Sequence, residues 1–330
     1  MPNWQEFRKL LEQQKNVVIV PHHRPDPDCL GSALALAHLL ETFGCNATVV
    51  QPQATPPGYL FLDPESKMRV IDEEGMSEFC AAADCIVLVD TSAWAQLGAM
   101  REHVEKFEKL RVVVDHHEVG DADLEAEFFT DSKIPATAEL VAGAYTTLEV
   151  PLTEQVATWL YAGIVTDSGW FRFPAVTAET YRTTALLVLA GASPPQVYKE
   201  LHEQEPISRL HLMGAILSRI KSLQNGRIAY TYLDWDDFER LGSHPSESED
   251  LINILLTADT VEVAVLLVGL KAGGYKASFR SQCTMNCAQL AKKFDGGGHA
   301  KAAGATLHTN RDEAIAQVMA QTEKDWKEKA

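Results

Sequence analysis

Acidic and histidine side chains follow several apolar runs in the first half of the chain. The segments concerned are NVVIVPHHRPDPD (16–28), CIVLVD (85–90), RVVVDHH (111–117) and GIVTDSGWF (163–171). A single polar strand end is commonly an ordinary turn, in which the side chains cap the backbone or face water. The repetition of acids and imidazoles after successive apolar runs indicates instead that these groups share one site.

The chemistry that these groups favour is metal binding. In an open parallel sheet the carboxyl ends of the strands lie along one edge, where ligands bind. The side chains that can converge there are His22, Asp26, Asp28, Asp90, His116 and Asp167. Several facing carboxylates repel one another and must take up protons or bind cations. Oxygen-rich ligation with histidines suits Mn²⁺, with Mg²⁺ or Co²⁺ as alternatives, whereas a structural zinc site would show cysteines.

The number of candidate ligands is too large for one ion. Two ions about 3.5–4 Å apart can clamp a phosphoryl group and generate a nucleophile from water near neutral pH. Asp26 and Asp28 are two residues apart in their loop, so they can point alternately, one toward each ion. Pro25 and Pro27 stiffen this loop. Gly31 opens a helical pattern whose N-terminal N–H groups would face the anionic site.

The elements that must position these groups are predicted from the period of the apolar residues. Short β-branched runs occur at 16–20, 47–51, 68–71, 85–89 and 111–114, and helical patterns occur at 29–44, 137–147, 153–166 and 177–190. Strands that alternate with helices predict an α/β fold, in which a mainly parallel sheet carries helices on both faces.

A second, smaller domain is predicted after a break in this pattern. GASPPQ (191–196) and EQEPIS (203–208) interrupt the helices, so we assign residues 1–190 to the first domain, 191–215 to a linker and 216–330 to the second domain. The second domain shows strand patterns at 227–233, 261–270 and 275–281, a helix with an acidic first turn at 247–258 and a helix at 286–294. These elements predict a mixed α/β domain.

The overall charge restricts the partners of the chain. The 330 residues carry a formal net charge of −17, which argues against a protein that coats long duplex nucleic acid through a basic face. Residues 271–301 are the basic exception, either as a solvated surface or as a binding surface for a small anion.

No apolar stretch has the 18 or more residues of a membrane helix, and the N-terminal residues lack the apolar core of a signal peptide. Six scattered cysteines fit a reduced, cytoplasmic protein.

The motifs together resemble the DHH phosphoesterase superfamily. The resemblance rests on HHRPDPD (22–28), VDTS (89–92), DHH (115–117) and TDSG (166–169), and on FRS (279–281) and GGGHAKAAGA (296–305), which are similar to the DHH-associated C-terminal domain. The length is similar to that of the bacterial nanoRNase/pAp-phosphatase branch. One departure is Gln96, at a position where many relatives have an arginine that is a candidate phosphate contact.

The resemblance implies a role for each matching residue. His22 and Asp26 would bind one ion, Asp28, His116 and Asp167 the other, and Asp90 would bridge both. His117 would contact phosphate or support a ligand, and Asp115 would orient a histidine through its ring N–H. The implied substrate-binding residues are Arg280, His299, Gly296, Gly297, Gly298, Lys301 and, as a candidate phosphate contact, Arg24. His23 lacks a motif position, and Cys29 is not needed as a nucleophile.

The activity implied by the resemblance is hydrolysis of very short oligoribonucleotides to nucleoside 5′-monophosphates, with removal of the 3′-phosphate of 3′-phosphoadenosine 5′-phosphate. The alternatives are a phosphodiesterase of cyclic dinucleotides or their linear products, and a nucleotide-binding module with a structural metal site. The expected partners are short RNA and small nucleotides, with no membrane partner, and a homodimer is allowed.

Overall fold

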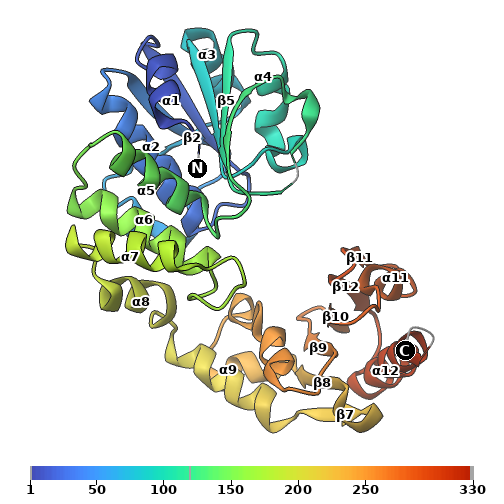
Figure 1. The fold of residues 1–330 in the computed structure, drawn as a ribbon. Helices are drawn as coiled ribbons and strands as arrows, with labels where there is room; N and C mark the ends of the chain where they lie inside the picture. Colours follow the sequence, from blue (N-terminus) through green and yellow to red (C-terminus); the bar gives the residue numbers. More distant parts are fainter. Residues whose placement is uncertain (1, 119, 328–330) are drawn as a thin grey trace. The chain divides into compact units, whose positions relative to one another are not determined.

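The computed structural model describes residues 2–118 and 120–327, and the chain divides into two compact units after Gln204 (Figure 1). The division falls within the segment 191–215 that the sequence assigns to the linker. This segment is mostly helical, because it contains α8 (Pro194–His202) and the start of α9 (Ile207–Ser218). The prolines permit this arrangement, since Pro194 and Pro195 occupy the first turn of α8 and Pro206 directly precedes α9, where no intrahelical N–H is required.

The N-terminal unit is built on a parallel sheet with the strand order β3-β2-β1-β4-β5-β6. The strands are β1 (Asn16–Pro21), β2 (Asn46–Gln51), β3 (Arg69–Val70), β4 (Cys85–Val89), β5 (Leu110–Asp115) and β6 (Glu127–Thr130). The strand order reverses direction between β1 and β4. This is the switch point at which a crevice opens beyond the carboxyl ends of parallel strands.

Helices cover both faces of this sheet, as the sequence predicts (Figure 1). They are α1 (Trp4–Leu11), α2 (Pro27–Thr42), α3 (Glu73–Ala82), α4 (Arg101–Glu105), α5 (Thr137–Thr147), α6 (Glu154–Asp167) and α7 (Ala178–Leu189). Ile19 and Val87 pack in the core with α2, α5 and α6, whereas Val18 and Ile86 pack in a separate core with α3 and α4. Because both faces are buried, the strands are continuous apolar runs without alternation.

A close helix contact fixes α2 beside α6. A Cβ atom on Gly31 of α2 would lie 2.3 Å from the backbone carbonyl oxygen of Trp159 in α6. Glycine is therefore required at residue 31 because the two backbones approach each other closely there. The contact matters for the site, since α2 carries Asp26 and Asp28 at its start and α6 carries Asp167 at its end.

The C-terminal unit is built on a mixed sheet with the strand order β11-β12-β10-β9-β8-β7, in which β8 and β9 pair in parallel. Its strands and helices are β7 (Lys221–Leu223), β8 (Ile228–Leu233), α10 (Trp235–Leu241), β9 (Val263–Gly269), β10 (Tyr275–Ser281), α11 (Cys287–Lys292), β11 (Gly297–Gly298), β12 (Ala302–Leu307) and α12 (Arg311–Lys327). One face of the sheet packs on α11 and α12, and the other packs on α9 and α10.

The prediction of a helix at 247–258 is wrong. The segment forms the short 3₁₀ helices η6 (Pro245–Ser248) and η7 (Leu251–Thr257). Asp250, between them, has a φ of +60°, and this left-handed backbone cannot continue a right-handed helix. Across the described ranges, no helix combines the length and the apolarity needed to cross a membrane.

Candidate metal centre and substrate site

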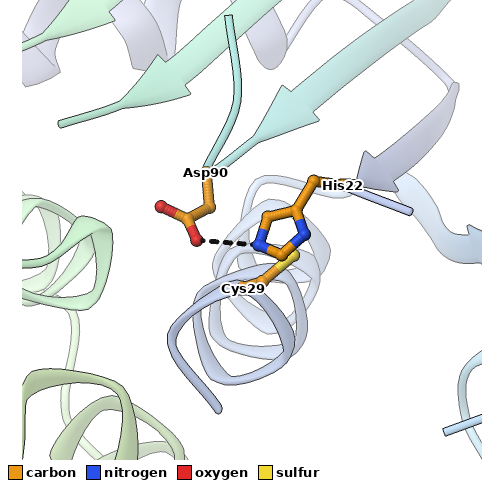
Figure 2. A group of neighbouring side chains, drawn as sticks. All are labelled: His22, Cys29 and Asp90. Atoms are coloured by element: carbon orange, nitrogen blue, oxygen red, sulfur yellow. Dashed lines mark ion pairs between the residues drawn. The ribbon is translucent and has the colours of Figure 1, made fainter. Parts of the chain in front are cut away.

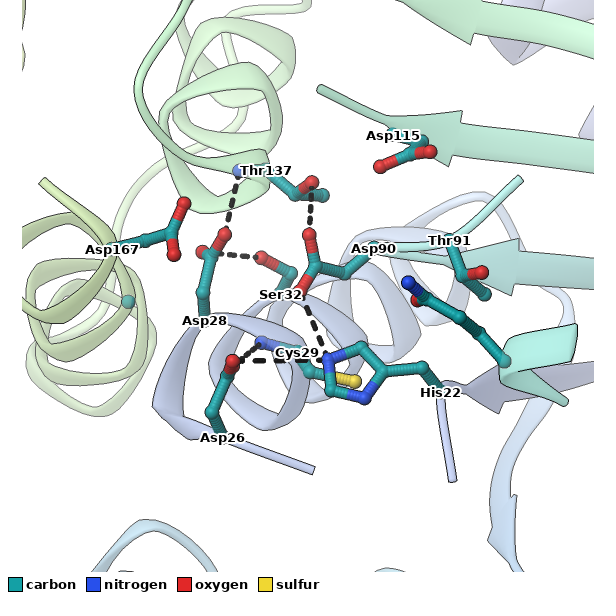
Figure 3. Close-up of polar contacts among 12 residues, drawn as sticks. His22, Asp26, Asp28, Cys29, Ser32, Asp90, Thr91, Asp115, Thr137 and Asp167 are labelled. Carbon is teal, nitrogen blue, oxygen red and sulfur yellow. Dashed lines mark hydrogen bonds and ion pairs between the residues drawn. The ribbon is translucent and has the colours of Figure 1, made fainter. Parts of the chain in front are cut away.

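Asp90 lies at the centre of the groups that follow the strands (Figure 3). Its Oδ2 is 3.3 Å from Nε2 of His22, and its Oδ1 is 3.7 Å from Nε2 of His116. The same two imidazoles reach further carboxylates, because His22 lies 3.8 Å from Oδ2 of Asp26 and His116 lies 3.1 Å from Oδ2 of Asp167. The two oxygens of Asp90 thus face two different histidines, which is the arrangement expected of a carboxylate between two ions.

The backbone of Asp90 is strained. Asp90 follows the last residue of β4 with a φ of +58°, and its side chain is buried. Its N–H donates to the carbonyl of Val114 in the neighbouring strand at 3.0 Å. A left-handed backbone at a residue other than glycine costs about 1–3 kcal/mol and persists only where the surroundings hold it. Here the turn directs the carboxylate toward His22 and His116.

Asp28 is held by the start of α5, which lies more than a hundred residues away in the sequence. Its Oδ2 accepts the backbone N–H of Thr137 at 2.8 Å, and its Oδ1 accepts the N–H of Ala138 at 2.8 Å. Ser32 donates its hydroxyl to Oδ1 at 3.3 Å. The N-terminus of a helix favours an anion, since its first N–H groups lack partners within the helix. This contact orients a carboxylate that is only 1% exposed.

Asp26, Asp28 and His116 hold protons more tightly than usual. Burial and the charges of Asp90 and Asp167 raise the pKa of Asp28 well above its ordinary value, and burial and Asp90 raise the pKa of Asp26. Burial lowers the pKa of His116, but the hydrogen bond to Asp167 and the charges of Asp28 and Asp90 outweigh burial and raise this pKa to about 10. Facing carboxylates therefore require cations, either protons or metal ions.

The two histidines of the DHH motif have different surroundings. His116 donates its Nδ1–H to the carbonyl of Ile134 at 3.0 Å, which leaves Nε2 free to act as a ligand between Asp90 and Asp167. Its side chain is 13% exposed, whereas that of His117 is 46% exposed. His117 donates its Nδ1–H to Oδ1 of Asp115 at 2.7 Å. The histidine that Asp115 orients is therefore His117.

Asp115 is fixed as an ionised partner of His117. Burial raises the pKa of its carboxyl, but the hydrogen bonds from His117 and Ser92 outweigh burial and lower the pKa below the ordinary value. Ser92 donates its hydroxyl to Oδ2 at 2.7 Å. Ser92, Thr137 and Ser32 are not predicted from the sequence as supporting residues, because their roles depend on contacts with Asp115, Asp90 and Asp28 that the fold creates.

A small cavity of about 270 Å³ lies over the cluster. It is lined by His22, His23, Arg24, Asp26, Asp90, Gln96, His117 and Asp167. His23, which the sequence analysis sets aside, is therefore part of the site. Its ring Nδ1 lies 2.9 Å from the carbonyl oxygen of Gln96, and its backbone N–H donates to the same oxygen at 2.8 Å. Gln96 thus holds the 22–25 loop through its backbone.

The predicted substrate-binding residues of the C-terminal unit lie in two places. Arg280 is half-buried and lines a cavity of about 480 Å³ within this unit, together with Lys276 and Ser278 of the same strand. Its guanidinium lies 3.4 Å from Oδ1 of Asp250. His299 is exposed beside the β11–β12 pairing and is not among the residues that line this cavity.

Local backbone contacts explain two of the three glycines at 296–298. A Cβ on Gly296 would lie 2.2 Å from the carbonyl oxygen of Gly304, and Gly298 has a φ of +139°. Both glycines therefore allow close backbone pairing next to His299, whereas a Cβ on Gly297 would meet no atom within 4 Å. Lys301 donates its ammonium to the carbonyl of Cys283 at 2.6 Å, so it is tied to the loop that precedes α11.

The cluster near Asp90 contains groups of ligand atoms close enough to hold an ion. The groups are His22, Cys29 and Asp90; Asp90, His116 and His117; and Asp28, His116 and Asp167, with the ligand atoms of each group within 4.8 Å of one another. Carboxylate oxygens with imidazoles fit the donor set of Mn²⁺ and Mg²⁺. Cys29 adds a sulfur atom that the sequence analysis does not count as a ligand (Figure 2).

Comparison with known proteins gives the family. Residues 16–164 match the DHH family, N-terminal domain, and residues 225–325 match the DHHA1 domain. The chain is 30% identical to the bifunctional oligoribonuclease and PAP phosphatase NrnA of Thermus thermophilus, over 96% of this chain and 93% of that protein. The chain belongs to the DHH family. The resemblance that the motifs indicate is thereby confirmed.

Two further proteins are similar over nearly the whole chain. The bifunctional oligoribonuclease and PAP phosphatase NrnA of Bacillus subtilis is 26% identical, over 92% of this chain and 93% of the relative. The crystal structure of an exopolyphosphatase-related protein from Bacteroides fragilis superposes with a TM-score of 0.81 and 26% identity, and it covers 97% of this DHH chain and 95% of the other. The predicted α/β fold with a mixed second sheet is confirmed. This DHH chain is therefore a hydrolase of the phosphoesterase class.

Proposed function

We propose that the chain is a two-metal phosphoesterase. It hydrolyses short oligoribonucleotides to nucleoside 5′-monophosphates and removes the 3′-phosphate of 3′-phosphoadenosine 5′-phosphate. The observation that carries this proposal is the position of Asp90, whose two carboxylate oxygens face His22 and His116 respectively. The names of the relatives from Thermus thermophilus and Bacillus subtilis support the substrate class.

The cluster would hold two divalent ions. His22 and Asp26 would bind one ion, Asp28, His116 and Asp167 would bind the other, and Asp90 would bridge them. Mn²⁺ fits this donor set best, with Mg²⁺ or Co²⁺ as alternatives. When bound, such a pair of ions neutralises charge on the phosphoryl group and makes water a stronger nucleophile near neutral pH.

The other residues of the N-terminal site would place the substrate. His117 lines the cavity and is held by the buried carboxylate of Asp115, so its free Nε2 can donate to a phosphate oxygen when the ring is protonated. The hydrogen bond to Asp115 raises the pKa of His117, which favours the protonated form. Arg24 lines the same cavity and provides a guanidinium beside the carboxylates for a phosphate.

The C-terminal unit would hold a second part of the substrate. Arg280 and His299 are the proposed contacts, and Lys276 and Ser278 lie beside Arg280 in its cavity. A dinucleotide has two recognition points, a scissile phosphate and a terminal phosphate or nucleotide. Outside residues 271–301 the chain is strongly acidic, which disfavours electrostatic binding of a longer strand. We therefore propose that short substrates are preferred over long ones.

A substrate panel tests the proposal. Purified protein with Mn²⁺ would be assayed on 3′-phosphoadenosine 5′-phosphate, RNA of two to about twenty-five nucleotides, cyclic dinucleotides and pyrophosphate, the upper length being well beyond the footprint of one small domain. We expect kcat/KM to be highest for the shortest RNA. A flat or rising length profile would favour a processive exonuclease, and preference for cyclic dinucleotides would favour the alternative phosphodiesterase.

A variant pair separates an enzyme from a nucleotide-binding module. Asp90→Ala should abolish hydrolysis, because it removes the carboxylate that faces both histidines. Asp236→Ala, at an exposed aspartate of α10, is the matched control and should keep wild-type turnover. Near-wild-type turnover of Asp90→Ala would overturn the two-metal assignment, and nucleotide binding without hydrolysis by the wild type would favour the binding module.

A further inference from the structure

Cys29 lies against the His22 end of the cluster (Figure 2). It is the third residue of α2, directly after Asp28, and its side chain is completely buried. Its sulfur, a ring nitrogen of His22 and a carboxylate oxygen of Asp90 lie within 4.8 Å of one another. The nitrogen and oxygen atoms of this group are 3.3 Å apart. The chain thus places sulfur, nitrogen and oxygen donors around one point.

The surroundings of Cys29 differ from those of the buried residues Cys45 and Cys85. The thiol of Cys45 donates to the carbonyl of Leu11 at 3.2 Å, and that of Cys85 lies 3.6 Å from the carbonyl of Ile86, as is usual for buried thiols. The sulfur of Cys29 instead lies beside a ring nitrogen of His22 and a carboxylate oxygen of Asp90. Burial and the charges of Asp90 and Asp26 raise the pKa of the Cys29 thiol, so the thiolate that binds metals would need a cation beside it.

We propose that Cys29, His22 and Asp90 form a thiolate-containing site for a thiophilic divalent ion such as Zn²⁺, Co²⁺ or Cd²⁺. Bonds of about 2.3 Å to sulfur and about 2.0–2.1 Å to nitrogen and oxygen require donor atoms roughly 3.3–3.8 Å apart in a tetrahedral site. The 3.3 Å between His22 and Asp90 meets this requirement for the nitrogen–oxygen pair, and the sulfur lies within 4.8 Å of both atoms. Binding releases the thiol proton to solvent, since the ligand is the thiolate.

The inference rests on the proposed metal centre. It adds a sulfur ligand that would distinguish Zn²⁺ and Cd²⁺ from Mn²⁺ and Mg²⁺. Mn²⁺ and Mg²⁺ prefer oxygen donors, whereas Zn²⁺ and Cd²⁺ also accept sulfur. A hard ion at His22 would use the carboxylate of Asp26, which lies 3.8 Å from the imidazole. A thiophilic ion would use Cys29 on the α2 side. Zn²⁺ would therefore compete with Mn²⁺ at this end of the centre through a ligand that Mn²⁺ does not need.

Spectroscopy of the full chain tests the sulfur ligand directly. Metal-free protein titrated with Co²⁺ or Cd²⁺ should develop a thiolate-to-metal charge-transfer band in the near ultraviolet. Cys29→Ser should lose the band and weaken Zn²⁺ binding by about tenfold or more, on the scale known for altered metal surroundings. Cys85→Ser, at a buried cysteine outside the described ligand groups, should keep both. An undiminished band in Cys29→Ser would overturn the inference.

Two further measurements keep the test decisive. Zinc-edge X-ray absorption of the wild-type chain with one equivalent of Zn²⁺ should show one sulfur at about 2.3 Å, and nitrogen and oxygen neighbours alone would overturn the inference without any variant. The thiolate site and the proposed function can be refuted independently of each other. Mn²⁺-dependent hydrolysis with no Cys29-dependent band would refute only the thiolate site, and the band without hydrolysis would refute only the proposed activity.

Discussion

The hydroxyl of Thr137 donates a hydrogen bond of 2.8 Å to Oδ1 of Asp90. The backbone N–H of the same residue donates to Oδ2 of Asp28 at 2.8 Å. The first residue of α5 therefore orients two of the proposed metal ligands at once, and both donors are buried.

Replacing the Thr137 hydroxyl should weaken metal binding. We expect Thr137→Val to raise the Mn²⁺ dissociation constant about 10–100-fold, because removal of groups that orient metal ligands has effects of this size. Thr137→Ser should remain close to wild type, since it keeps the hydroxyl. Titration calorimetry of the full chain measures this difference. Thr146→Val, which removes a helix hydroxyl that donates to the carbonyl of Ala142, is the control on the same helix. Equal affinities for Thr137→Val and Thr146→Val would contradict the prediction.

Alanine substitutions of the two histidines of the DHH motif should differ in their effects on metal content and on turnover. His116→Ala should lose one ion, because Nε2 of His116 lies between Asp90 and Asp167. His117→Ala should keep both ions and lose turnover, since this histidine is held by Asp115 and faces the cavity. Metal content after gel filtration, compared with kcat for the same preparations, checks both expectations. Equal metal loss in the two variants would show that the roles are divided wrongly.

Metal-dependent stabilisation should increase with pH. Burial and nearby charges raise the pKa of Asp26 and Asp28 above 3.8, so in the metal-free chain the folded state loses stability as the pH rises from 3.8 through the raised values. The stabilising contribution of His116 is fully present below its ordinary value of 6.5 and is lost as the pH rises through about 10. Both effects make the folded state of the metal-free chain less stable as the pH rises.

Divalent ions replace these protons, so they restore the stability that deprotonation removes. We expect the difference in Tm between Mn²⁺-loaded and EDTA-treated protein to grow from about pH 6 to about pH 9. Scanning fluorimetry at constant ionic strength measures it. Asp28→Asn serves as the comparison, since it removes one titrating carboxyl and should show a shallower pH dependence. A difference that stays constant or shrinks across this range would contradict the assignment.

The strand-end ligands could be predicted from the sequence because buried parallel strands are short, continuous apolar runs. His22, Asp90 and His116 follow such runs directly, so the topology alone brings them to one edge. Thr137 could not be found in this way, because its partners Asp28 and Asp90 are 109 and 47 residues away. Nothing in its own segment distinguishes it from an ordinary helix start.

Other features depend on tertiary packing or on backbone geometry. The helix expected at 247–258 has suitable composition, but the left-handed backbone at Asp250 divides it into 3₁₀ segments. β6 is short and mostly exposed, so it lacks an apolar run that would predict a strand. His23 has no motif position that would predict a role in the site, yet it lines the cavity and its ring lies 2.9 Å from the carbonyl oxygen of Gln96.

Removing the guanidinium of Arg280 should affect substrate binding more than metal binding. We expect Arg280→Ala to raise KM for RNA dinucleotides about tenfold or more, the scale of one lost hydrogen bond to a charged group. Mn²⁺ affinity should be unchanged, since the proposed ligands all lie in the N-terminal unit. Lys271→Ala, at an exposed lysine outside the Arg280 cavity, is the matched control. Steady-state kinetics with unchanged KM for Arg280→Ala would remove this residue from the substrate site.

The hydrogen bonds from Thr137 and Ala138 to Asp28 join residues 109 and 110 positions apart. Closing so long a stretch of chain carries an entropy cost before the contact repays it, so we expect these contacts to form late in folding. Interactions absent from the transition state change the unfolding rate rather than the folding rate. We therefore expect ions bound at Asp28 to leave the refolding rate nearly unchanged and to slow unfolding, so that metal loading acts mainly by extending the lifetime of the folded chain.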